Sequence, residues 1–427
     1  MSFRTTATVA AFFVFALVFT VRAQAAAQAQ NNDFVSLQEH AAGGDAQAQF
    51  ALANRYYGGL DVAQDYGQAV IWYRKSAAQG FAPAQNQLGY MHEHKFGLPR
   101  DYKRALNYYR LAANKGYALA EYNLAAMYQS GLWVKRDYKQ AFEWDRKAAE
   151  QNLPDAEEVV GYFYQCGLGV KRDYVQALAW YHRAASHGNS KAENQLGYMA
   201  EKGWGQPQSY NEAFSWYYKA ADHGSDEAME NIGYNFQYGI GVAVDYVQAR
   251  SWLYKAAALE NGDAENQLGW MYQFGQGVKP DDNKAVAWYR LAIDQGNIHA
   301  KNNLHAFEEE LEDRGGGFWE SANQPASDPA IEMVQRRARI RDLRAQITGL
   351  EADALQGEDS ADELAHMGDS GKKKNGGIAK VMDAFGTVAG VKPRLDAAKS
   401  REEAARLREE LAKLEYLDQS SANVSAP

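Results

Sequence analysis

The sequence predicts an all-α array of seven 36-residue repeats, because three kinds of residue recur at one fixed interval. An aromatic residue marks one place in six repeats and an aspartate marks it in the seventh: Tyr66, Tyr102, Tyr138, Tyr174, Tyr210, Tyr246 and Asp282. An alanine follows each marker by three residues, and a tryptophan or tyrosine follows the alanine by three more. Seven repeats therefore fill residues 45–296, which favours one elongated unit over several compact domains.

The composition restricts the classes of protein that fit this array. The 427 residues are 46% apolar and 23% charged, with a net charge of −9. This charge disfavours a surface that binds nucleic acid or an anionic membrane. Cys166 is the single cysteine, which excludes an intramolecular disulfide framework and a cysteine-rich metal site. We expect no cofactor.

Residues 1–27 have the features of a cleaved secretory signal peptide. Arg4 supplies the charged start, Val9 to Val21 form the apolar core, and Ala23 to Ala27 offer small residues for cleavage. The core is shorter than the ~20 apolar residues that a spanning helix needs, so cleavage is favoured over a membrane anchor. We expect export to the periplasm or the exterior of a bacterial cell.

Residues 33–44 are expected to form an N-terminal capping helix, and each repeat is expected to form two helices. The second helix of a repeat begins after a residue that can accept hydrogen bonds from backbone N–H groups: Asp65, Asp101, Asp137, Asp173, Ser209, Asp245 and Asp281. A residue three positions later is predicted to complete a capping box: Gln68, Gln140, Gln176, Glu212 and Gln248. A glycine is predicted to end this helix in a left-handed conformation: Gly80, Gly116, Gly188, Gly224 and Gly296.

Small and apolar residues give each helix one buried face. The second helix carries alanine, tryptophan and paired alanines at three- and four-residue steps, as at Ala177, Trp180, Ala184 and Ala185. The first helix carries alanine, leucine, glycine and methionine, as at Ala192, Leu196, Gly197 and Met199. Small residues on both faces let the two helices approach closely.

Two stretches, Ala264 to Val278 and Asp173 to Gly188, resemble Sel1-like repeats, which are α/α solenoids related to tetratricopeptide repeats. The resemblance covers residues 45–311 and implies a right-handed α/α superhelical solenoid. Departures from the pattern suggest local irregularity in the third, fifth and sixth repeats: Asn152 and Glu260 at the helix-ending glycine, Asp145 and Leu253 at the second aromatic, and Gln206-Pro207 at one turn. Members of this family commonly act as adaptors, so the resemblance implies a protein-binding scaffold.

The period stops after the seventh repeat. Residues 297–313 are expected to form a C-terminal capping helix, 314–330 a linker, and 420–427 a disordered end. Residues 331–419 are expected to form a coiled-coil-like tail of two amphipathic helices around a mobile middle from Glu358 to Asn375. These helices could pair as an antiparallel hairpin or mediate self-association. The apolar stretch from Ile378 to Val391 is better explained by packing against the hairpin than by contact with a membrane surface.

No catalytic motif stands out, so we expect a protein that is not an enzyme. His92 and His94 lie on different faces of a helix, which argues against a metal pair. The paired acids Glu157 and Glu158 are interpreted as lying on a helix face that is exposed to solvent. His187 and His223 precede glycines that end helices, where a histidine suits the helix dipole and needs no catalytic role.

One set of residues on the first helices is a candidate binding surface. The aromatic ladder is defined as Tyr90, Tyr162, Tyr198, Tyr234 and Trp270, which share one repeat position. Amides lie three residues before it and rings four residues after it: Gln195, Asn231, Gln267, Tyr238 and Phe274. First helices usually line the concave side of such arrays, so these groups could hold an extended peptide or a glycan. The alternative is that neighbouring rings stack and only stiffen the array.

These observations favour an exported scaffold that binds an unidentified protein or peptide on its concave face. A second hypothesis is an envelope hydrolase or penicillin-binding protein, because some exported relatives with Sel1-like repeats are associated with such activities. Those relatives carry a cysteine pair in each repeat, which this chain lacks. A third hypothesis is a scaffold for the cell wall or an exopolysaccharide.

Overall fold

The computed structural model describes residues 33–313, 328–371 and 397–418. The expected signal peptide, most of the linker, the apolar stretch from 378 to 391 and the C-terminal end lie outside these ranges. Within them, all regular secondary structure is helical, and none of the described helices has the length and apolarity that crossing a membrane requires. Two compact units divide the described chain, one of 33–124, 352–371 and 397, the other of 125–313, 328–351 and 398–418.

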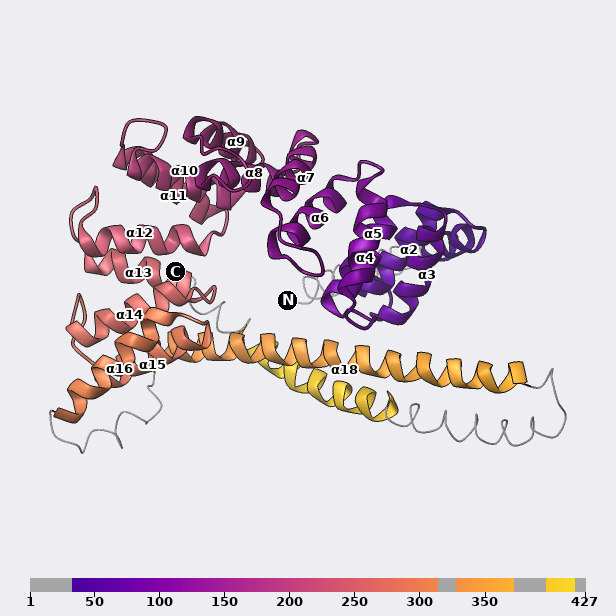
Figure 1. Cartoon of the computed structure of the whole chain (residues 1–427). Coiled ribbons are helices and arrows are strands. Elements are labelled where there is room, and N and C mark those ends of the chain that lie inside the picture. The colour runs from indigo at the N-terminus through magenta and orange to yellow at the C-terminus, as the bar shows by residue number, and fades with distance from the viewer. Residues whose placement is uncertain (1–32, 314–327, 372–396, 419–427) are drawn as a thin grey trace, which may run out of the picture. The chain divides into compact units, whose positions relative to one another are not determined.

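Fourteen helices build the seven repeats, and within each compact unit successive helices pack on one another as in a solenoid (Figure 1). The first helices are α2 (Ala46–Gly58), α4 (Ala82–His94), α6 (Ala118–Ser130), α8 (Pro154–Cys166), α10 (Ser190–Lys202), α12 (Asp226–Tyr238) and α14 (Gly262–Phe274). The second helices are α3 (Tyr66–Ala78), α5 (Tyr102–Ala113), α7 (Tyr138–Glu150), α9 (Tyr174–Ser186), α11 (Tyr210–Asp222), α13 (Tyr246–Ala257) and α15 (Asp282–Asp294). The predicted all-helical repeat fold is confirmed.

The remaining described helices lie at the ends of this array. A helix over 33–42 precedes α2. After the last repeat come α16 (Ile298–Asp313), α18 (Pro329–Gly371) and a helix over 397–418. Since α18 continues to Gly371, the polar stretch beginning at Glu358 is helical that far and not a break between two helices. Alanine, glutamate and leucine in this stretch have high helix propensity, and it contains no proline.

The second helices begin at the predicted caps, but only one of the two hydrogen bonds of the predicted capping box forms. Each cap side chain accepts a backbone N–H, as when Asp65 accepts from Gln68 at 2.9 Å. The backbone N–H of the cap does not go to the glutamine side chain. It donates to a carbonyl of the preceding first helix, as from Asp173 to the Tyr164 oxygen at 2.9 Å, and this bond recurs in all seven repeats. The turn between the two helices of a repeat is thereby closed by backbone.

The residues that replace the helix-ending glycine adopt the conformation of that glycine. Gly188 has a φ of 77°, while Asn152 has 62° and Glu260 has 64°. Asparagine enters this left-handed region more readily than most residues, and the cost for glutamate is of the order of 1–2 kcal/mol. The expected local irregularity at these two positions is therefore absent from the backbone.

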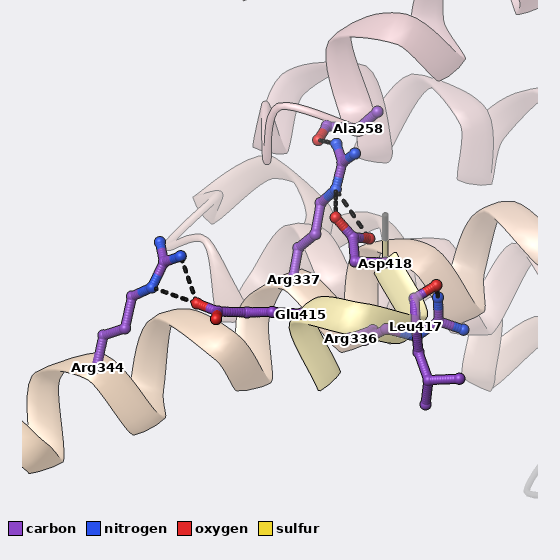
Figure 2. A network of polar contacts seen from close by, with 7 residues as sticks. All are labelled: Ala258, Arg336, Arg337, Arg344, Glu415, Leu417 and Asp418. Atoms are coloured by element: carbon purple, nitrogen blue, oxygen red, sulfur yellow. Dashed lines mark hydrogen bonds and ion pairs between the residues drawn. The ribbon is translucent and has the colours of Figure 1, made fainter. Parts of the chain in front are cut away.

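The N-terminal part of α18 docks on the end of the solenoid. Ile331 and Val334 are each 1% exposed and belong to the same hydrophobic cluster as Trp288 and Phe307 of the last helices. Figure 2 shows the polar border of this contact, where Arg337 donates to the Ala258 carbonyl at the end of α13. The C-terminal region is thus part of the folded array.

The helix over 397–418 pairs with α18 as an antiparallel hairpin within one chain. Leu343 and Ile347 of α18 form a cluster with Ala404 and Leu407. Ion pairs flank this cluster: Arg337 with Asp418 at 3.2 Å and Arg344 with Glu415 at 2.6 Å (Figure 2), and Arg339 with Glu410 at 2.8 Å. Of the two arrangements left open by the sequence, the structure shows the hairpin.

Removal of the Ile331 side chain is predicted to destabilise the C-terminal end. Ile331→Ala should lower the free energy of unfolding by about 2–5 kcal/mol, because it leaves a cavity in a buried cluster. Ile298→Ala is the matched control, since Ile298 is 63% exposed, and it should change the stability by less than about 0.5 kcal/mol. Urea titration followed by tryptophan fluorescence measures both. Equal effects of the two substitutions would contradict the docking of α18.

Candidate functional site

The aromatic ladder lies at the surface, on a row of positions four residues apart along each first helix. In α12 the row is Glu230, Tyr234 and Tyr238, and in α14 it is Asn266, Trp270 and Phe274; residues at this spacing share one helix face. Four of the predicted rings are exposed: Tyr162 by 43%, Tyr234 by 40%, Tyr238 by 48% and Phe274 by 51%. Tyr90, Tyr198 and Trp270 are half-buried.

The close ring pairs of the ladder run along single helices. Tyr234 and Tyr238 have ring centroids 4.5 Å apart, and Trp270 and Phe274 have theirs 4.4 Å apart. Tyr90 lies 4.2 Å from the His94 ring in the same way. Each pair is tilted, so each helix presents a broad apolar surface of two rings instead of one.

The predicted amides bridge successive repeats. Asn231 on α12 donates to the Asn194 side chain on α10 at 3.0 Å, and Gln267 on α14 donates to Glu230 on α12. The same bond joins Asn123 to Asn86 and Asn303 to Asn266, both at 2.9 Å. Gln195 holds the equivalent position on α10 and is half-buried. The side-chain amides of Asn231 and Gln267 therefore each use one N–H to hold the repeats together.

A second set of tyrosines, which the sequence-based prediction missed, is buried between the two helices of a repeat. Tyr109 is fully buried and donates to Glu93 at 2.7 Å, and Tyr289 donates to Gln273 at 2.8 Å. A glycine faces each ring: a Cβ on Gly89 would lie 2.7 Å from the Tyr109 ring. The recurrent spacing of this glycine and tyrosine was the available signal.

Two repeats lack this tyrosine, and each contains an unpartnered buried oxygen. In the sixth repeat Leu253 takes its place, and the Gln237 Oε1 atom is buried without a hydrogen bond. In the third repeat Asp145 takes its place and accepts from Gln129 at 2.8 Å, while its Oδ1 atom has no partner. Burial raises the pKa of Asp145 well above its ordinary value. The expected irregularity at Leu253 and Asp145 is thus a missing hydrogen bond to a buried oxygen.

The interpretation of Glu157 as part of a solvated face is wrong. Its side chain is fully buried and pairs with Arg183 at 2.9 Å, with His187 at 3.8 Å. Glu193 in the next repeat pairs with Lys219 at 3.0 Å and with His223 at 2.7 Å. The two histidines therefore contact a carboxylate in addition to any effect of the helix dipole.

The other acid of that pair, Glu158, is half-buried, so the solvated interpretation fails for it as well. Burial raises the pKa of Glu158 to about 7. Within the described ranges, no group of three or more histidine, cysteine, aspartate or glutamate side chains is placed to hold a metal ion.

In the seventh repeat the buried glutamate, Glu265, lacks the basic side chains that pair with Glu193 in the fifth repeat. Leu291 and Gln295 stand where Lys219 and His223 stand two repeats earlier. Both carboxylate oxygens of Glu265 are buried without a hydrogen bond. Burial, together with the charge of Asp294, raises the pKa of Glu265 to about 8.

Comparison with known proteins gives one family and several solved structures. The family model described as Sel1 repeat matches seven consecutive segments: residues 46–81, 82–117, 118–153, 154–189, 190–225, 226–261 and 262–297. None of the curated proteins matches the chain.

Two solved structures are similar over most of their length. One is c5321, a protective antigen present in uropathogenic Escherichia coli strains and displaying an SLR fold; it is 25% identical, the match covers 92% of this chain and 98% of that one, and the TM-score is 0.54. The other is a Sel1 repeat protein from Oxalobacter formigenes, which is 34% identical, with 66% of this chain and 81% of that one covered and a TM-score of 0.51.

The unpaired Glu265 predicts a pH-dependent stability. The pKa in the folded chain exceeds the ordinary value of 4.5, so the folded state retains a proton that the unfolded state releases. The stabilising contribution is complete below about pH 4.5 and is lost as the pH rises through about 8. Glu265→Gln should therefore raise the melting temperature at about pH 9 by at least about 3 °C and change it little at about pH 5.

Glu193→Gln is the control for that experiment. It removes the ion pair with Lys219 and weakens the contact with His223, so it should lower the melting temperature at both pH values. Calorimetry at each pH measures the four values. The same effect of Glu265→Gln at both pH values would refute the assignment of a buried, unpaired carboxyl.

The buried tyrosines predict opposite effects in two repeats. Leu253→Tyr should stabilise the chain by about 1 kcal/mol, because its hydroxyl can donate to the unpartnered Gln237 oxygen. Tyr181→Phe should destabilise it by about 1–3 kcal/mol, because it leaves the Gln165 oxygen unsatisfied. Urea titration checks both signs, and a destabilising Leu253→Tyr would show that the sixth repeat has no room for the ring.

Proposed function

This chain belongs to the Sel1 repeat family, and from that premise we propose that it is an exported, non-enzymatic scaffold that binds a protein or peptide. The binding surface is the row of exposed rings on the first helices. One observation carries the proposal: the ring pairs of α12 and α14 lie on first helices that contact one another, so four rings gather on neighbouring rows.

The exposure of these rings supports a binding role. Tyr238 and Phe274 are each about half exposed, although large apolar side chains are usually buried when they serve only the fold. Aromatic side chains supply much contact area and have few rotamers to restrict, which is why they dominate protein interfaces. The bridging amides hold successive rows at a constant spacing and so keep the surface rigid.

Export is part of the proposal. It rests on the pattern of residues 1–27 and on the similarity to c5321, which is a protective antigen of Escherichia coli. Self-association through the C-terminal helices remains a prediction. The apolar faces of these helices are buried within the chain's own hairpin, so a dimer through them would require the hairpin to open.

Loss of three ladder rings is predicted to reduce partner capture strongly. The variant Tyr198→Ala, Tyr234→Ala and Trp270→Ala should recover at least about tenfold less of a specific partner from bacterial envelope extract, because central aromatic anchors contribute most of the binding energy. Mass spectrometry compares the proteins captured by the mature chain and by the variant. Tyr416→Ala is the control, since this ring on the last helix is 73% exposed and lies outside the ladder.

Identical captures by the wild type and the triple variant, with both folded by circular dichroism, would contradict a site on the ladder. Sedimentation with purified peptidoglycan distinguishes a glycan partner from a protein. If the triple variant no longer sediments with peptidoglycan but captures the same proteins as the wild type, the partner is a glycan and not a protein.

A further inference from the structure

We propose that the surface formed by α12 and α14 recognises a cationic side chain, lysine or arginine, of the bound peptide. The cation lies against the Glu230 carboxylate and beside the rings of Tyr234 and Trp270. This inference rests on the proposed function and adds the chemical class of the partner.

The carboxylate and the rings belong to one continuous surface. Glu230, Tyr234 and Tyr238 follow each other at four-residue steps on α12, so they form one row. Gln267 of α14 donates to Glu230 and lies one turn before Trp270, which places the rings of α14 beside that row. Figure 1 shows α12 and α14 in the part of the solenoid that precedes α16.

The charges around Glu230 favour a cation. The charged groups that act on its carboxyl come from three helices and are all acids: Asp226 on α12, Asp263 on α14 and Glu201 on α10. Burial and these acids raise the pKa of Glu230 to about 7, against the opposing effect of the Gln267 hydrogen bond. A carboxylate in this environment gains more from an incoming cation than a solvated one does. A peptide with acidic side chains would be repelled.

A cation contact over the equivalent ring occurs one repeat earlier in the chain. On α10, the Lys202 ammonium lies 5.2 Å over the ring of Tyr198 and pairs with Glu201 at 2.6 Å. Tyr198 and Lys202 correspond to Tyr234 and Tyr238 on α12. On α12 a tyrosine replaces this lysine and Gln237 replaces Glu201. This helix contains no lysine or arginine, so under this proposal the cation beside Glu230 comes from the partner. Cations are held over exposed rings by the ring quadrupole.

The test uses the full mature chain and short, labelled Gly-Ser peptides that carry a central lysine, acetyl-lysine or glutamate. Fluorescence anisotropy should show that the lysine peptide binds at least about tenfold more tightly than the acetyl-lysine peptide, which lacks the charge. Glu230→Gln, Tyr234→Ala and Trp270→Ala should each weaken binding of the lysine peptide by about five- to tenfold. Glu409→Gln is the control, because it removes the same charge from an exposed position on the last helix.

A pH series adds a readout that a purely structural role of Glu230 would not change. Protonation through a pKa of about 7 removes the negative charge, so the affinity of the wild type should fall as the pH is lowered from about 8 to about 6. Glu230→Gln should lose this dependence. A wild type whose affinity does not change over this range would overturn the role of the carboxylate.

The remaining outcomes separate this inference from the proposed function. Equal binding of the lysine and acetyl-lysine peptides, weakened alike by the ring variants, would overturn cation recognition and leave the peptide-binding surface in place. If Glu409→Gln and Glu230→Gln weaken binding of the lysine peptide equally, the effect comes from the net charge of the chain and the proposed site is wrong. No binding of the lysine peptide up to about 1 mM would also overturn the inference, while the envelope capture tests the proposed function independently.

Discussion

The close approach of a glycine on the first helix to a tyrosine on the second underlies the arrangement of the second, fourth, fifth and seventh repeats. In the fifth repeat, a Cβ on Gly197 would lie 2.6 Å from the Tyr217 ring, so no larger residue fits without displacing the ring. The approach buries the alanine, leucine and methionine face of the first helix. The opposite row, which includes Tyr198, then remains at the surface. The exposure of the candidate site is therefore a consequence of how tightly the two helices pack.

Features that depend on local sequence could be predicted from the sequence. The period, the cap at Asp173 and the left-handed glycine at Gly188 each follow from residues within a few positions, where backbone preferences decide the conformation. The backbone bond from Asp173 to Tyr164 could not be predicted in this way, because it requires the turn to bring two helices together. The same limit applies to Glu157, whose partner Arg183 belongs to the other helix of the repeat.

The candidate site was predicted in part for the same reason. The helical period identified which row of the first helices avoids the core, and the exposure of Tyr234 and Phe274 agrees with it. The sequence did not show that Asn231 and Gln267 each donate one side-chain N–H to the preceding repeat, because their partners occupy a different position of that repeat. Nor did it decide the pairing of the C-terminal helices, since a leucine face suits a partner from the same chain or another one equally well.

The side-chain amide bonds between successive repeats have an evolutionary consequence. Each such bond joins a repeat to its immediate neighbour, as Asn303 joins Asn266 and Asn231 joins Asn194. The ends of the array are completed by other elements, namely the helix over 33–42 and α18. The bonds are not identical, because Gln267 pairs with Glu230 and Val159 occupies the amide position of the fourth repeat. Gene duplication or deletion of an interior repeat would therefore leave the ends of the array unchanged, but it would keep the amide bond only where the new neighbour carries a matching side chain.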